Sequence, residues 1–98
     1  MAKKVTVIVT ETARDDLASM VEYVSTDSPR AARRIIRTIH DRLKTLRSFP
    51  KLGRVIPEIG DPALREIVVD PYRILYRLRK GRIEILRALH GRQFFAGI

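Results

Sequence analysis

Arginine side chains are concentrated between Arg65 and Arg92, a stretch that also contains a histidine. Seven arginines and Lys80 face only three acidic residues there. A guanidinium group presents five N–H donors in one plane and binds phosphate or carboxylate oxygens in pairs. We therefore expect a binding surface for a target protein or a nucleic acid, formed by Arg54, Arg65, Arg73, Arg77, Arg79, Arg87 and Arg92.

The same stretch has the pattern of three consecutive strands. Runs of β-branched, aliphatic and aromatic residues are separated by turn-forming pairs, and they cover Arg65–Val69, Tyr72–Leu78 and Ile83–Leu89. Pro71 lacks the N–H that a strand ladder needs, and Gly81 can take the positive φ of a tight hairpin turn. The pattern predicts an antiparallel meander.

Alternation along the middle strand predicts what each face of this sheet presents. One face carries Tyr72, Ile74, Tyr76 and Leu78, whereas the other carries Arg73, Leu75, Arg77 and Arg79. We expect the first face to pack on a core and the second to stay open and cationic. For any single arginine, a merely solvated side chain whose stem covers apolar surface is the alternative.

The rest of the chain supplies the elements that cover the apolar face. Val5–Thr10 reads as a strand, and two amphipathic helices follow, one from Thr12 to about Asp27 and one from Ser28 to about Ser48. A long loop with a short extended piece at Arg54–Ile56 covers 49–64. The prediction is a single α+β domain over residues 1–98, in the order β-α-α-β-β-β, with the helical hairpin on one face of an antiparallel-dominated sheet.

Composition narrows the classes of partner and site. The chain has 98 residues, no cysteine, two histidines and a formal net charge of +9. We expect no metal site and no cofactor, and an anionic partner such as a nucleic acid or an acidic protein. The apolar run near the N-terminus is too short for a signal peptide or a membrane span, so we expect a cytoplasmic protein with no membrane partner.

The ordered set of motifs resembles the RelE/ParE superfamily of toxins from type II toxin–antitoxin systems. The resemblance covers almost the whole chain and rests on residues 13–17, Ser28-Pro29, Ala31-Ala32, Leu46, Phe49-Pro50, Gly53-Arg54, Arg65-Glu66, residues 72–76 and Leu89-His90-Gly91-Arg92. It implies a plasmid-stabilisation toxin that inhibits growth and forms a heteromeric complex with a cognate acidic antitoxin.

The resemblance leaves the cellular target open between two branches. RelE-like members cleave mRNA in the ribosomal A site, and ParE-like members poison DNA gyrase without being nucleases. Metal-independent RNA cleavage needs an acid, a base and cations around the phosphate. If this chain is a ribonuclease, the resemblance and the chemistry together nominate His90, Arg92, Arg73 and Arg65 as its catalytic residues.

The C-terminal tail, Gly91–Ile98, favours the gyrase-inhibiting branch of the superfamily. RelE-like ribonucleases usually place a tyrosine or histidine there, whereas Phe94, Phe95 and Ile98 cannot move a proton. His90 has a suitable unperturbed pKa but comes slightly before the expected position. Glu66 and Glu84 are alternative bases, although each is expected to pair with a neighbouring arginine. Gyrase inhibition is the favoured hypothesis, a ribosome-dependent ribonuclease the alternative, and a non-toxic nucleic-acid-binding module a third.

Overall fold

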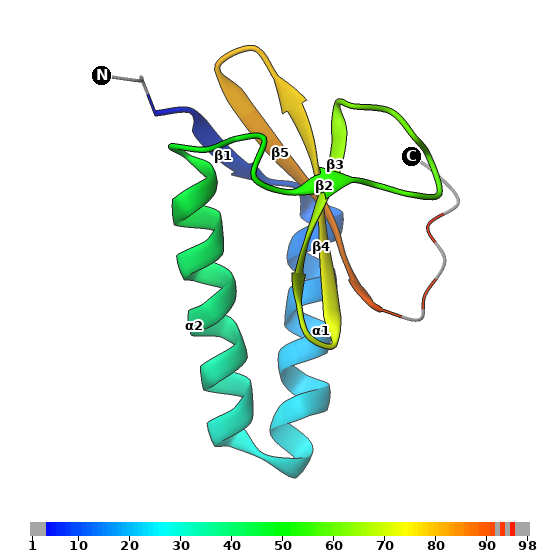
Figure 1. Ribbon diagram of the computed structural model, residues 1–98. Helices are drawn as coiled ribbons and strands as arrows, with labels where there is room; N and C mark the ends of the chain where they lie inside the picture. Colours follow the sequence, from blue (N-terminus) through cyan, green and yellow to red (C-terminus); the bar gives the residue numbers. More distant parts are fainter. Residues whose placement is uncertain (1–3, 92, 94, 96–98) are drawn as a thin grey trace.

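The computed structural model describes residues 4–91, 93 and 95, and it combines a helical hairpin with a five-stranded sheet (Figure 1). The elements in chain order are β1 (Thr6–Val9), α1 (Glu11–Asp27), α2 (Pro29–Leu46), β2 (Arg54–Val55), β3 (Leu64–Val69), β4 (Tyr72–Arg79) and β5 (Arg82–His90). Arg92 and Phe94 lie outside the described residues.

The strand order in the sheet is β1-β5-β4-β3-β2. The pairs β2–β3, β3–β4 and β4–β5 are antiparallel, whereas β1 pairs with β5 in parallel, with Val7 opposite Ile83. The predicted meander and the predicted α+β class are therefore confirmed, and β1 joins the meander as an edge strand. Gly81 takes the positive φ that its hairpin requires, at 75°.

Two hydroxyl caps fix where the helices begin. The Thr10 Oγ1 atom accepts a hydrogen bond from the Ala13 N–H and donates one to the Ile85 carbonyl at 2.7 Å, so it ties the start of α1 to β5. The sequence pattern predicts this start at Thr12, two residues after the observed cap. Ser28 caps α2 as predicted, accepting from the Ala31 N–H, and Pro29 occupies the first helical position.

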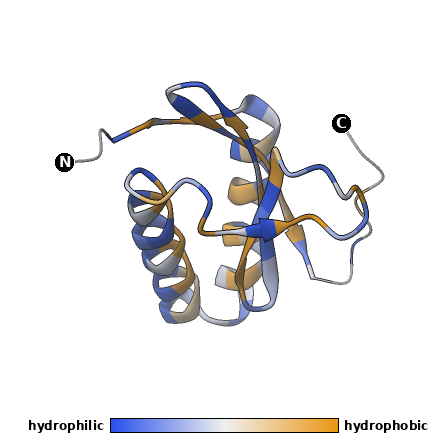
Figure 2. Cartoon of the chain, turned by 45° about the horizontal axis from the view of Figure 1, so that its top comes forward, coloured by the Kyte–Doolittle hydropathy of each residue, from blue (hydrophilic) through white to orange (hydrophobic). Residues whose placement is uncertain are grey.

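Both helices turn their apolar stripes toward one face of the sheet. The buried core between them contains Ala13, Met20, Ile39, Leu46, Ile67, Val69, Tyr72, Ile74, Tyr76, Ile83, Ile85 and Ala88. Hydrophilic segments of α2 follow its outer side in Figure 2. Over the described part of the chain, no helix is long and apolar enough to cross a membrane.

The opposite face of the sheet is closed around Arg73 and Leu75, so the prediction of an open cationic face is wrong there, whereas Arg77 and Arg79 on the same face stay partly or fully exposed. A second apolar cluster covers it, formed by Ile56, Leu64, Leu75, Leu89 and Phe95. Leu75 sits between the arginines of β4 and Leu89 lies on β5, so this face has an apolar centre of its own. The loop before β3 and the segment after β5 contribute Ile56 and Phe95, which remove that centre from water.

The Tyr76 hydroxyl links β4 to the loop between α2 and β2, and its contribution to stability can be tested. Its buried hydroxyl donates to the Pro50 carbonyl at 2.7 Å and accepts from the Gly53 N–H at 2.9 Å. We expect Tyr76→Phe to lower the free energy of unfolding by about 1–3 kcal/mol, because both backbone groups lose this partner. Chemical denaturation measures the loss. The matched control is Tyr23→Phe, whose side chain is exposed on α1. An unchanged midpoint for Tyr76→Phe would contradict the assigned role.

Candidate functional site

Arg73 lies at the centre of the closed face and uses all of its hydrogen-bonding capacity. Its Nε donates to Glu66 Oε2 at 2.7 Å, and its two terminal nitrogens donate to Glu58 at 2.8 and 2.9 Å, to Glu66 Oε1 at 3.3 Å and to the Gln93 carbonyl at 3.1 Å. These five bonds equal the five N–H donors of a guanidinium group. Arg73 is 7% exposed, so it is a buried, saturated cation.

The two carboxylates around Arg73 hold different parts of the chain. Glu66 is buried on β3 and also pairs with Arg54 at 3.2 Å. Glu58 comes from the loop and accepts the Phe95 N–H at 3.2 Å, so it anchors the segment that follows β5. The hydrogen bond to Arg73 is the main cause that lowers the pKa of the Glu58 carboxyl from 4.5 to about 2. The two carboxylates in turn raise the pKa of Arg73.

Arg65 binds backbone oxygens of the loop before β3. Its Nε donates to the Pro62 carbonyl at 2.9 Å, and its Nη1 donates to the carbonyls of Gly53 at 3.0 Å and Lys51 at 3.4 Å. Arg65 therefore fixes the course of this loop across the sheet. The donors of its guanidinium group are therefore used by backbone carbonyls of the protein itself.

A β-bulge lies beside Arg87 on β5. Leu75 pairs with Arg87 and Tyr76 pairs with Ile85, which leaves one extra residue on β5. Arg87 then binds Asp16 of α1 through two bonds, at 2.7 and 3.2 Å, and the same carboxylate accepts the Ala88 N–H at 3.0 Å. The hydrogen bonds that Arg87 donates to the Asp16 carboxylate raise the pKa of Arg87. Arg87 therefore fastens α1 to the sheet and is not grouped with Arg73.

The remaining arginines of β4 lie near its hairpin end. Arg79 pairs with Glu84 at 3.3 Å, and Arg82 contacts the same carboxylate at 3.6 Å. The Arg79 hydrogen bond is the main cause that lowers the pKa of Glu84. Arg77 lies opposite Glu84 in the strand pairing. The predicted pairing of Glu66 and Glu84 with neighbouring arginines is confirmed.

His90 lies on the other side of the sheet from Arg73. Its exposed ring contacts Tyr72 edge-on, with ring centroids 5.8 Å apart, and its backbone N–H donates to the Gln93 side chain. Tyr72 belongs to the helix-side core, whereas its neighbour Arg73 points to the closed face. His90 contributes to a groove of about 660 Å³ between α1, the start of α2 and the end of β5.

The candidate residues thus separate into four places. Arg54 and Arg73 pair with the carboxylates of the closed face, and Arg65 holds the loop before β3 beside Tyr76. Arg87 holds α1, and Arg77 and Arg79 lie near the β4–β5 hairpin. Arg92 lies outside the described residues. Within residues 4–91, 93 and 95, no group of three histidine or acidic side chains could hold a metal ion.

The sequence pattern did not predict the role of Glu58, whose carboxylate accepts two hydrogen bonds from the Arg73 guanidinium group. Glu58 is a loop residue without periodic neighbours, 15 positions before the arginine that it binds. The available signal was indirect: an arginine at an inward-facing strand position next to leucine requires a carboxylate partner. That requirement does not say which acidic residue supplies it.

Comparison with known proteins gives one family and a set of related toxins. The family of ParE toxins of the type II toxin–antitoxin system parDE matches residues 7–95. Toxin RelE2 of Caulobacter vibrioides is 33% identical over 85 residues, which cover 86% of this chain and 92% of that protein. Toxin ParE3 of the same organism is 43% identical over 51 residues, covering 52% and 50%.

Two solved structures share the fold. The chromosomal ParDE toxin–antitoxin system from P. aeruginosa superposes with a TM-score of 0.71 over 91% of this chain and 98% of the matched chain, at 23% identity. The toxin–antitoxin complex RelBE2 from Mycobacterium tuberculosis gives 0.60 over 92% and 94%, also at 23% identity. Their similarity extends across the helical hairpin and the sheet described above.

The Arg73 cluster makes a prediction about stability. Arg73→Met removes the cation from two carboxylates that are 15% and 0% exposed. We expect the free energy of unfolding to fall by about 3–5 kcal/mol, because a buried pair is broken from one side. Arg79→Met is the control, since it breaks a more exposed pair and should cost at most about 1 kcal/mol. Equal losses in the two variants would contradict the burial argument.

The lowered pKa of Glu58 predicts how stability changes with pH. A carboxyl whose pKa falls on folding contributes stability above its unfolded value, here about 4.5, and that stability is lost as the pH falls toward about 2. We expect Glu58→Gln to be less stable at neutral pH and to lose less stability across this window. Thermal unfolding between pH 2 and 7 measures both effects. Glu22→Gln, at an exposed position of α1, is the control and should keep the wild-type pH profile.

Proposed function

Because this chain belongs to the ParE toxin family of type II toxin–antitoxin systems, we propose that it inhibits growth by binding DNA gyrase, without catalysis of its own. Its relatives are type II toxins of the ParE and RelE kinds, and the fold is theirs. The choice between DNA gyrase and ribosome-bound mRNA as the target depends on the chemistry that the site can perform.

The observation that carries the proposal is the state of Arg73. A ribonuclease needs cations directed at the scissile phosphate and a proton-transfer group within hydrogen-bonding reach of the same phosphodiester. Arg73 instead gives its five donors to Glu58, Glu66 and the backbone, beneath a loop and a buried phenylalanine. His90, the candidate acid or base, lies across the sheet. This arrangement supports action by binding.

The same family membership supports a partner that neutralises the toxin. Both superposed structures are described as toxin–antitoxin systems or complexes. The net charge of +9 favours an acidic antitoxin, because opposite potentials accelerate association and reject cationic competitors. We propose a heteromeric complex with a cognate acidic antitoxin as the inactive form.

One observation favours the ribonuclease alternative. The relative that aligns over most of this chain is named RelE2. For this alternative, Arg73 must leave Glu58 when RNA binds, and His90 must reach the same phosphate from the far side of the sheet. The cost of exposing two buried carboxylates makes this the second choice.

The two functions predict different products and different sensitivities to substitution. We expect the purified chain to inhibit supercoiling by DNA gyrase, and induction without the antitoxin to trigger DNA damage while transcript ends stay unchanged. His90→Gln should retain full inhibition, because no proton transfer is involved. Supercoiling assays and transcript-end mapping measure the two outcomes. Cuts within codons on ribosomes, lost in His90→Gln, together with unaffected gyrase, would establish the alternative.

A further inference from the structure

The two helices of the hairpin carry opposite charge. In α1, five carboxylates accompany one arginine, whereas α2 carries six cations and one aspartate. None of the ion pairs among the described residues joins an arginine or lysine of α2 to a carboxylate. In the sheet, Arg73 and Arg87 are paired with carboxylates, whereas the six cations of α2 have no such pair among the described residues.

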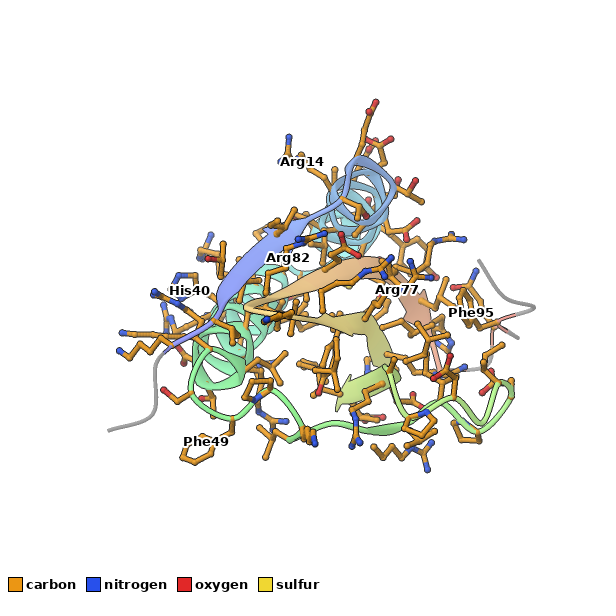
Figure 3. All side chains as sticks on the ribbon, turned by 90° about the horizontal axis from the view of Figure 1, so that it is seen from above. Arg14, His40, Phe49, Arg77, Arg82 and Phe95 are labelled. Carbon is orange, nitrogen blue, oxygen red and sulfur yellow. The ribbon has the colours of Figure 1, made fainter. Side chains whose placement is uncertain are left out.

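Five of the α2 cations lie on one side of the helix. At 100° per residue they fall within an arc of roughly 100°, opposite the stripe of Ile39 and Leu46 that packs on the core. All five are exposed, and together they form what we name the α2 cationic row: Arg30, Arg33, Arg34, Arg37 and Lys44. Figure 3 shows nearby His40 on the outer side of α2, directed away from the sheet.

The row is long, and its helix contains no aromatic residue. From Arg30 to Lys44 the helix rises about 21 Å, at 1.5 Å per residue. Asp41 is the one acidic residue of α2, and the helix has no Phe, Tyr or Trp. Protein interfaces depend on buried aromatic or apolar anchors at their centre, from which charged residues are depleted. Within the described part of the chain, Ile36 is the one large apolar side chain exposed beside the row, and a line of guanidinium groups without an aromatic anchor suits the repeated phosphates of a nucleic acid.

We propose that the α2 cationic row binds the phosphate backbone of duplex DNA. A B-form duplex carries one negative charge per about 1.7 Å of axis, so a row of this length meets a continuous line of phosphates. The choice of DNA over RNA rests on the proposed function, since gyrase acts on duplex DNA. The row would hold the toxin against DNA beside the enzyme that it inhibits, with no reading of base sequence.

The test measures DNA binding without gyrase, so its outcome is independent of toxin activity. Fluorescence anisotropy with a 20-base-pair DNA duplex gives the dissociation constant at several salt concentrations. Each lost phosphate contact reduces the slope of log K against log salt by about 0.9. We expect the triple variant Arg33→Gln, Arg34→Gln, Arg37→Gln to reduce the slope by about 2.7 and to weaken binding strongly at low salt.

Two control variants test whether binding depends on the position of the lost charges and whether it depends on charge at the row itself. Lys51→Gln, Lys80→Gln, Arg82→Gln removes the same charge from exposed positions elsewhere and should leave the slope nearly unchanged. Arg33→Lys, Arg34→Lys, Arg37→Lys keeps the charge and should preserve the wild-type slope. A full wild-type slope in the glutamine variant of the row, or an equal loss in the control, overturns the proposal.

The same anisotropy measurement with a duplex RNA of the same sequence tests the choice of DNA over RNA. Tighter binding of RNA than of DNA, with the same dependence on α2, overturns the assignment to DNA. Gyrase inhibition is then assayed separately. A chain that inhibits gyrase but whose row variant binds DNA like the wild type disproves this inference alone, whereas α2-dependent DNA binding without gyrase inhibition disproves the proposed function alone.

Discussion

A charged guanidinium group cannot be buried without its counter-charges, and this requirement organises one half of the molecule. Arg73 takes Glu66 from the neighbouring strand, Glu58 from the loop and the Gln93 carbonyl from the segment after β5. Two strands, a loop and the segment after β5 therefore meet around one side chain. The second apolar cluster, with Leu75 and Phe95, packs on the same face and shields these pairs from water.

This cluster gives the two faces of the sheet separate roles. Tyr72 and Arg73 are neighbours on β4, so their side chains must point to opposite faces. Because His90 pairs with Tyr72, its ring contacts the helix-side residue, and the closed face keeps Arg73. The division follows from the two-residue period of a strand together with the register. It explains why a histidine and an arginine that are both close to Tyr72 do not form one site.

The parts of this structure that sequence could predict are those with a period or a local signal. The helical stripes, the Ser28-Pro29 start and the Gly81 turn each depend on neighbours within a few residues. The closed face could not be predicted in this way, because Glu58 and Phe95 reach Arg73 from segments without regular periodicity. The alternation of Arg73 with Leu75 indicated a cationic face, yet the burial of Leu75 required a cover. The register of β4 and β5, which places His90 opposite Tyr72, could not be predicted either, because it depends on contacts between residues far apart in the sequence.

Net charge in a sequence does not say where charge is available. The sequence pattern indicated the arginines between Arg65 and Arg87 as the binding surface, but Arg73 and Arg87 neutralise carboxylates that hold elements of the fold together. Burial selects which cations are paired, since an unpaired charge is costly only where water is excluded. The cations of α2 stand on a solvated helix face and need no internal partner. The cations of α2 therefore form a positive surface that is not paired with carboxylates among the described residues, and an anionic partner can reach it.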